Sequence, residues 1–292
     1  MESKKQIYDL IPAAYYPQTI FIKANTPPSN ITESIKLAGL RFPLVCKPDI
    51  GMKGMAVKKT ETEHELAQYV AGSKVDFLVQ EYISYPNEVG IFYYRYPNEN
   101  RGQISGIVKK EFLTVTGDGV STVEELLQKD KRHVLQIPML KKSYAEKLNL
   151  ILKMKEELLL VPYGNHVRGA KFTDDSNLID EKLLDTIDSI CKKIQGFYFG
   201  RMDVRFNTWE ELRQGNNFSI IELNGAGSEP THIYDPKHSI FFAWSEILKH
   251  NNILWRISRM NHHPEHRPYM STALGLKMFR ENSQYLKLIS GK

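Results

Sequence analysis

The chain has 292 residues, of which 41% are hydrophobic and 25% charged, the composition of a globular protein with one large or two coupled domains. Its formal net charge is +5, but basic and acidic residues are interspersed, without the basic stripe of a nucleic-acid-binding protein. No apolar run approaches the ~20 residues of a membrane-spanning helix, and no signal peptide opens the chain. Two cysteines, Cys46 and Cys191, cannot build a disulfide framework. We expect a cytoplasmic protein that binds small molecules, with no nucleic-acid partner and no membrane span.

Four prolines up to residue 30 mark the opening of the chain as mostly irregular, around one short strand over 19–23. A short helix is expected over 31–40, where the apolar residues are spaced for one inward face. Thr60 and Glu63 form a capping-box pattern ahead of a second helix that ends near Gly72. With strands on either side, these elements predict a small α+β lobe.

A glycine-containing turn, 49–54, follows a short apolar run that ends in Lys47. The strand after this turn makes the unit a hairpin, unlike the Walker phosphate loop, which leads from a strand into a helix. Gly51 and Gly54 let the backbone approach a ligand, and exposed N–H groups can bind phosphate oxygens. Lys47 adds a positive charge to the same task. Taken alone, the pattern favours an ordinary hairpin with an exposed lysine.

A buried strand ending near Gln80 leads into an extended connection with acidic residues at Glu81 and Glu88. Extended backbone exposes N–H and C=O groups that can pair with a purine edge, and a carboxylate can accept hydrogen bonds from ribose hydroxyls. Taken singly, the segment is a loop between two strands.

Paired strands are expected over 88–96 and 102–116. Lys109 and Lys110 lie in the second of them and must face opposite ways, so at most one can reach a nucleotide. A long helix is expected from Ser143 to about Leu160.

An amphipathic helix is expected over 180–195, where apolar residues recur at helical spacing. The loop 162–170 before it carries Arg168. This arginine either clamps a substrate carboxylate through two parallel hydrogen bonds or belongs to a self-bonded surface turn. Apolar helical spacing after Ser239 predicts a helix that closes the large lobe, with a partner or membrane-surface contact as the alternative.

Two apolar runs, 199–205 and 220–225, carry polar residues at alternate positions, and a polar segment between them predicts a hairpin loop. Because successive side chains of a strand point to opposite faces, the polar residues of each strand share one face. Two carboxylates, an amide oxygen and a guanidinium then form a site for Mg²⁺ beside a cation that neutralises phosphate charge. A solvated strand face is the alternative. The residues concerned are Arg201, Asp203 and Arg205 on the first strand and Glu222 and Asn224 on the second.

In this order the segments resemble the ATP-grasp superfamily, most closely its carboxylate–amine ligases of the D-alanine–D-alanine ligase type, over roughly residues 40–236. By similarity, Lys47 is the phosphate-binding lysine and residues 49–54, with Gly51 and Gly54, are the flap over the nucleotide. Glu81, Tyr82, Ile83 and Ser84 resemble the hinge that reads adenine, and Glu88 the ribose-binding glutamate. Asp203, Glu222 and Asn224 match the Mg²⁺ ligands, and Arg201 matches the arginine beside the transferred phosphoryl group.

The sequence also departs from these ligases. Residues 225–230 stand where the ligases carry a Thr-Ser-Pro-Gly-like turn, which leaves the substrate open. The spacing between Asp203 and Glu222 is long, which lengthens the hairpin. Relatives of this type usually carry another domain in front of the small lobe.

The resemblance implies an α+β protein with an ATP-grasp fold, whose two lobes enclose the nucleotide. We expect residues 1–86 to form the small lobe with an N-terminal extension, and residues 87–292 the large lobe with the metal site and C-terminal helices. The implied reaction joins a carboxylate to an amine through an acyl phosphate, with ATP and Mg²⁺ as cofactors, amino-acid-like substrates, and Arg201 and Arg168 in catalytic roles. Another ATP-grasp chemistry, such as carboxylation or phosphotransfer, and a non-catalytic nucleotide-binding protein are the alternatives. The identity of the substrates and the oligomeric state stay open.

Overall fold

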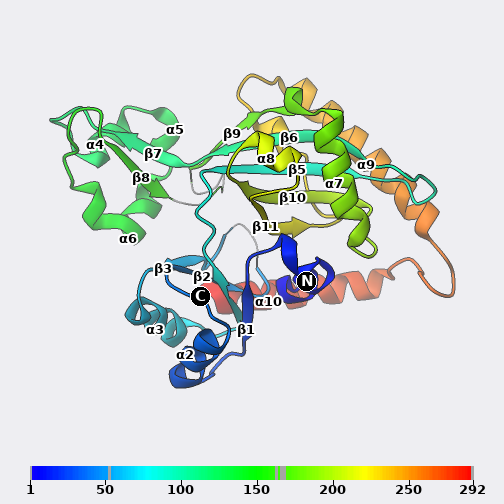
Figure 1. Cartoon of the computed structure of the whole chain (residues 1–292), viewed down its shortest axis with the longest axis horizontal. Coiled ribbons are helices and arrows are strands. Elements are labelled where there is room, and N and C mark those ends of the chain that lie inside the picture. Colours follow the sequence, from blue (N-terminus) through cyan, green and yellow to red (C-terminus); the bar gives the residue numbers. More distant parts are fainter. Residues whose placement is uncertain (1, 52–53, 162–163, 165–168, 291–292) are drawn as a thin grey trace.

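The computed structural model describes residues 2–51, 54–161, 164 and 169–290, and it contains two larger antiparallel sheets and one two-stranded sheet (Figure 1). The first has the strand order β1-β4-β2-β3, the second β11-β10-β5-β6-β9, and the third pairs β7 with β8. The strands are β1 (Thr19–Ile22), β2 (Leu44–Pro48), β3 (Lys58–Thr60), β4 (Phe77–Glu81), β5 (Asn87–Tyr94), β6 (Gln103–Glu111), β7 (Leu113–Thr116), β8 (Glu157–Val161), β9 (Lys171–Asp174), β10 (Phe199–Phe206) and β11 (Phe218–Asn224). The helices are α1 (Lys4–Leu10), α2 (Pro28–Leu37), α3 (Glu63–Gly72), α4 (Val123–Gln128), α5 (Lys131–Val134), α6 (Ile137–Leu148), α7 (Glu181–Lys193), α8 (Trp209–Arg213), α9 (Ile240–Asn261) and α10 (Thr272–Ser290).

The small lobe is the four-stranded sheet with α2 and α3 on one side, around a buried apolar core that includes Ile31, Leu44 and Leu66. The Thr62 side chain caps α3 by accepting a hydrogen bond from the Glu65 amide, so the predicted cap at Thr60 is two residues too early. The opposite face of this sheet carries Lys47 and faces the large lobe.

The large lobe is the five-stranded sheet, with α7 packed on one face of it. The predicted helix over 180–195 is confirmed: Asp180 caps its first turn, and its apolar stripe packs on the sheet. The hydroxyl of Tyr93 on β5 donates to Asp188 at 2.7 Å, which satisfies both groups inside this interface.

A third unit, residues 113–161, has a core of its own beneath β7 and β8. The predicted long helix from Ser143 to Leu160 is wrong: α6 begins at Ile137 and ends at Leu148, and the apolar run after it forms β8. An apolar run of this length carries no period that separates a strand from a buried helix.

Two helices occupy stretches that were expected to be irregular. Helix α1 begins after Ser3, whose hydroxyl accepts from the Gln6 amide, inside the opening region. Helix α8 lies within the connection between β10 and β11. The Thr208 hydroxyl caps this helix by accepting a hydrogen bond from the Glu211 amide. The connection is therefore a compact helical turn within the predicted hairpin.

Helix α9 packs on the large sheet through a buried histidine. The His250 Nδ1 lies 2.7 Å from the Glu246 carbonyl and its Nε2 lies 2.8 Å from the Ser105 hydroxyl. A neutral ring satisfies both contacts, because Nδ1–H donates to the carbonyl while Nε2 accepts from the hydroxyl. Burial lowers the pKa of His250, against the raising effect of the Glu246 carbonyl and carboxylate.

We expect the protein to lose thermal stability below about pH 6.5 partly through this histidine. The pKa of His250 is lower in the folded than in the unfolded chain. Its contribution to the free energy of unfolding is therefore complete above the pKa of the unfolded chain and is lost as the pH falls below it. Neighbouring His232 has a pKa lowered by burial and acts in the same direction. His250→Gln should therefore show a smaller fall in melting temperature between pH 7 and pH 5 than the parent. An equal fall in both proteins would contradict this role.

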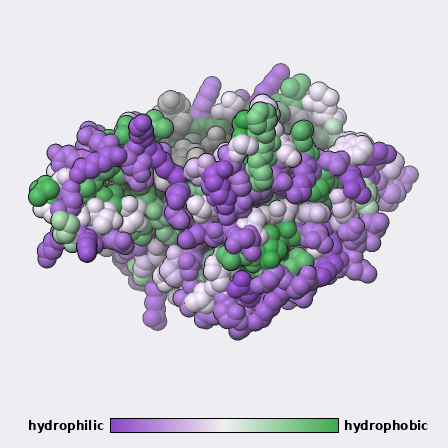
Figure 2. Space-filling model, turned by 90° about the horizontal axis from the view of Figure 1, so that it is seen from above, coloured by the Kyte–Doolittle hydropathy of each residue, from purple (hydrophilic) through white to green (hydrophobic). Residues whose placement is uncertain are grey.

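The C-terminal helix α10 leaves the large lobe and runs to the small lobe, where the helix ends close to β2 and β3 (Figure 1). The two lobes are thus joined by α10 as well as by the direct connection from β4 to β5. The surface in Figure 2 is mostly hydrophilic, with hydrophobic side chains in separate patches. Within the described ranges, no helix combines the length and apolar character that a membrane span requires.

Candidate functional site

The predicted metal strands lie side by side. In the register of β10 and β11, Asp203 is opposite Glu222 and Arg201 is opposite Asn224, so the four side chains share one patch of the sheet. A bulge follows Asp203, where the register shifts by one residue. The hairpin thus brings together the residues that the sequence pattern singled out.

A continuous chain of buried charges crosses β10, β5 and β6. Arg201 Nε lies 2.9 Å from Asp203, whose other oxygen lies 2.8 Å from Lys110 Nζ. Lys110 Nζ also lies 3.1 Å from Glu88, which in turn pairs with Arg205 Nε at 3.2 Å. The sign of the charge alternates along the chain, so every buried ion has an opposite neighbour.

These buried ion pairs show which of the two lysines of β6, Lys109 or Lys110, faces the site. The side chain of Lys110 is 4% exposed and lies between two carboxylates, whereas that of Lys109 is 45% exposed and pairs with Glu111. Burial lowers the pKa of Lys110, but Asp203 and Glu88 outweigh this and raise it above its ordinary value. Lys110 is therefore the charged lysine that faces the site.

Asp203 is held as a carboxylate. Burial raises its pKa, but the charges of Arg201 and Lys110 and their hydrogen bonds lower it below the ordinary value. A carboxylate that stays ionised is available as a hard anionic ligand.

Lys47 reaches across from the small lobe to the strand that carries Glu222. Its Nζ donates to the Tyr8 hydroxyl at 2.7 Å, to Gln80 Oε1 at 2.8 Å and to the Ile221 carbonyl at 3.3 Å. Burial lowers the pKa of Lys47 to about 8, against the raising effect of Glu222. Lys47 thus lies at the junction of both lobes, where an incoming phosphate would restore its full charge.

Helix α1 adds a second lysine that the sequence analysis missed. Lys4 Nζ donates to the Gly51 carbonyl at 3.0 Å, and the Lys5 amide donates to the Asp49 carboxylate at 2.8 Å. Burial lowers the pKa of Lys4, while nearby Glu222 raises it. The only sequence signal for this helix was Ser3 as a cap ahead of an apolar pair, Ile7 and Tyr8.

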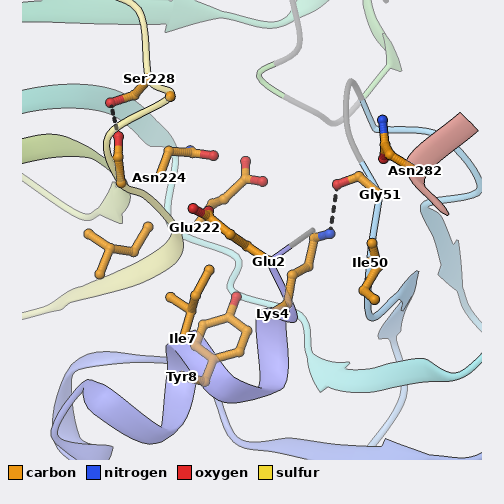
Figure 3. A pocket seen from close by; sticks show the side chains of 13 residues that line it. Glu2, Lys4, Ile7, Tyr8, Ile50, Gly51, Glu222, Asn224, Ser228 and Asn282 are labelled. Atoms are coloured by element: carbon orange, nitrogen blue, oxygen red, sulfur yellow. Dashed lines mark hydrogen bonds between the residues drawn. The ribbon is translucent and has the colours of Figure 1, made fainter. Parts of the chain in front are cut away.

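Figure 3 shows the cavity of about 270 Å³ into which these groups point. Lys4 and Tyr8 come from α1, Glu222 and Asn224 from β11, and Gly51 from the segment after β2. The remaining wall includes Ser228 and, from α10, Asn282. The cavity therefore lies where the two lobes, the N-terminal helix and the C-terminal helix meet.

The predicted hinge lies at the end of β4. Glu81 and Ser84 are exposed and Tyr82 and Ile83 are half-buried. The Ile83 carbonyl accepts from Arg205 at 2.6 Å, and the Lys59 ammonium lies 4.2 Å from the centre of the Tyr82 ring. These contacts tie the hinge to the chain of buried charges.

Tyr82 and Lys59 line a larger cavity, of about 860 Å³, between the small lobe and the third unit. Val161 and Tyr144 of the third unit lie on the opposite wall. The size and the mixed lining fit a ligand as large as a nucleotide.

Three predicted residues, Glu88, Arg168 and Gly54, lie apart from the 270 Å³ cavity or outside the described residues. Glu88 is buried in ion pairs with Lys110 and Arg205, and a Cβ atom added at Gly164 would lie 2.1 Å from its Oε1. In this structure Glu88 thus organises the buried charges, and ribose contact stays a prediction. Arg168 lies outside the described residues, and Gly54 is half-buried beyond the 270 Å³ cavity.

The donor set fits a magnesium ion. Asp203 and Glu222 supply carboxylates and Asn224 an amide oxygen, which are the hard ligands that Mg²⁺ takes. The Asn224 amide nitrogen is buried without a hydrogen-bond partner, and within the described ranges the Glu222 carboxylate has neither a hydrogen bond nor an ion pair. The free Glu222 carboxylate can bind the metal, whereas the Asn224 amide nitrogen can only donate and so suits an acceptor oxygen of a bound ligand such as a phosphate.

Lys47→Ala is expected to weaken binding of ATP more than binding of adenosine, because the lost contact is to phosphate. A charge-assisted hydrogen bond contributes about 1.5–3 kcal/mol, so the loss for ATP should be roughly ten- to a hundredfold. Calorimetry with both ligands measures it. Equal losses for ATP and adenosine would assign Lys47 a purely structural role.

A model of the RimK-like ATP-grasp domain matches residues 13–176, more than half of the chain. The chain belongs to this ATP-grasp family. The predicted resemblance and the α+β fold class are thereby confirmed. ATP-grasp proteins use ATP with Mg²⁺, so membership supports both as cofactors of this chain. No protein of curated function matches this ATP-grasp chain significantly.

Three solved structures are similar to it. They are a bifunctional glutathione synthetase from Pasteurella multocida (16% identity, TM-score 0.43), the VanG D-Ala:D-Ser ligase from Enterococcus faecalis (15%, 0.49) and the ATP-grasp ligase PsnB bound to a minimal precursor (13%, 0.46). The matches cover 88%, 87% and 87% of this chain, but 36%, 61% and 60% of those chains. The chain thus spans about a third to three fifths of the length of these structures.

Proposed function

We propose that the protein is an ADP-forming ligase that joins a carboxylate to an amine, with amino-acid-like substrates. The γ-phosphoryl group of ATP passes to the carboxylate, and ADP leaves. The amine then attacks the carbonyl carbon of the acyl phosphate, phosphate leaves, and the amine loses a proton to give the amide. A carboxylate alone is a poor electrophile, so the phosphoryl group supplies the missing leaving group.

The observation that carries this proposal is the set of oppositely charged groups on β10 and β11 and at the end of β2, beside the 270 Å³ cavity that Lys4, Glu222 and Asn224 line. Phosphoryl transfer needs positioning and neutralisation of charge more than covalent chemistry. Lys47 and Arg201 would bind phosphoryl oxygens, and Lys110 keeps Asp203 ionised. Asp203, Glu222 and Asn224 would hold Mg²⁺, which neutralises phosphate charge when bound.

The division of the chain near residue 86 belongs to the same proposal. Residues 1–86 would form the small lobe and residues 87–292 the large lobe, with the nucleotide between them. Helix α10 returns from the second part to the first, so it couples the two lobes. Both cysteines are free and buried, which supports our assignment to the reducing cytoplasm.

An ADP-release screen over pairs of small carboxylates and amino acids tests the activity. A productive pair should release ADP and phosphate only when both partners are present, and mass spectrometry should find the amide. AMP and pyrophosphate would contradict the acyl-phosphate route. Turnover with a carboxylate alone would favour the phosphotransfer alternative, and nucleotide binding without turnover would favour the non-catalytic one.

A further inference from the structure

The C-terminal helix α10 has one packed face. Its half-buried residues recur every three or four positions, which places them along one stripe of the helix. Residues outside this stripe are open to solvent, among them Leu276, which is 55% exposed, and Phe279, which borders the stripe and is 76% exposed. Asn282 is the one amide side chain on a stripe that is otherwise apolar or aromatic. The stripe consists of Gly275, Met278, Asn282, Tyr285, Leu286 and Ile289.

This stripe lies against the segment that follows β2. The Tyr285 hydroxyl is buried beside the backbone of Ile50, and burial raises its pKa. Ile289 Cδ1 would lie 3.7 Å from a Cβ atom added at Gly51. Lys4 of α1 donates to the Gly51 carbonyl, so two helices hold residues 50 and 51 in place.

The same helix borders both cavities. Asn282 lines the 270 Å³ cavity together with Glu222 and Asn224, and Figure 3 shows its side chain beside Gly51. Leu288 and Ile289 line the 860 Å³ cavity. The amide of Asn282 offers both a donor and an acceptor at the cavity wall.

We infer that α10 closes the reaction site and excludes water from it. This inference rests on the ligase function proposed above. Asn282 contacts the substrate in the smaller cavity, while Tyr285 and Ile289 are positioning residues that hold Ile50 and Gly51 against it. Docked α10 keeps water from the acyl phosphate. When the helix is undocked, water attacks the intermediate and yields the original carboxylate and phosphate, so ATP is hydrolysed to ADP without an amide.

The test compares Tyr285→Ala and Ile289→Ala with the matched control Phe279→Ala on the exposed face of the same helix. In the two test variants, the ratio of ADP released to amide formed should rise from about one to two or more. The KM for ATP should rise by a factor of about three or more. The control should behave like the parent. A ratio that stays near one in both test variants would overturn the inference.

A second measurement does not depend on ligation. Hydrogen exchange at residues 49–51, with the non-hydrolysable β,γ-imido analogue of ATP bound, should quicken in Tyr285→Ala and Ile289→Ala but not in Phe279→Ala. Faster exchange in a protein that makes no amide would uphold the closing role and refute the ligase. Unchanged exchange in an active ligase would refute the closing role alone.

Asn282 is tested by itself. Asn282→Ala should raise the KM for the carboxylate or the amine about tenfold, with the KM for ATP and the exchange at residues 49–51 unchanged. Asn282→Asp keeps the size but removes the donor and adds a charge, so it should change the preference among charged substrates. Parent-like KM values in both variants would remove Asn282 from the site.

Discussion

Glu222→Gln is expected to lower Mg²⁺-dependent ATP turnover at least about 100-fold and to leave the fold intact. The substitution removes one of two anionic metal ligands, and a bound metal contributes several kcal/mol to the stabilisation of developing charge. Glu222 is only half-buried and makes no ion pair among the described residues, so its removal breaks no direct contact, although its charge raises the pKa of Lys47 and of Lys4. Turnover and the melting temperature are both measured.

Glu210→Gln is the matched control, because Glu210 is an exposed glutamate on α8 that pairs with Lys182. It should keep the turnover of the parent. Asp203→Asn should also abolish turnover, but it takes the shared anion from Arg201 and Lys110 and should lower stability as well. A folded Glu222→Gln protein with parent-like turnover would refute the metal assignment.

Lys110→Met should destabilise the protein by about 3–5 kcal/mol, because it leaves Glu88 and Asp203 facing each other without the cation between them. For a chain of this size, that corresponds to a fall in melting temperature of roughly 10 °C. Turnover at a temperature where the variant is folded should fall too, since the buried charges around Asp203 are no longer balanced.

The control for this prediction is the neighbouring residue. Lys109→Met removes a lysine from the same strand, but one whose side chain is 45% exposed and pairs with Glu111 at 3.6 Å. Exposed pairs of this kind contribute about 0–1 kcal/mol, so the melting temperature should hardly change. Similar losses in both variants would show that Lys110 has no special place in the site.

The parts of the fold that the sequence predicts well are those with a local period. Helix α7 and the alternating strands β10 and β11 follow from the spacing of residues within each element, and so does the shared face of Arg201 and Asp203. The ATP-grasp resemblance followed from four such segments in order along the chain.

The rest depends on contacts between distant residues. Because successive side chains of a strand alternate between its two faces, Lys109 and Lys110 must face opposite ways. Only the packing of β6 between β5 and β9 decides which of them is buried. Tyr8 lies on the N-terminal helix α1 and contacts Lys47. The prolines at 12 and 17 led us to predict irregular structure for this part of the chain. Asn282 is more than two hundred residues from Lys47 in the chain, so no local pattern could connect them.

The third unit, residues 113–161, has a further consequence for the larger cavity. Every member of its core, from Leu113 to Val161, comes from the segment itself, and the chain enters it once and leaves it once. A segment with its own core and few connections behaves as a cooperative unit that can rotate as a rigid body relative to the rest of the protein. Because Tyr144 and Val161 of this unit form one wall of the 860 Å³ cavity, such a rotation would set the width of the cavity without unfolding either lobe.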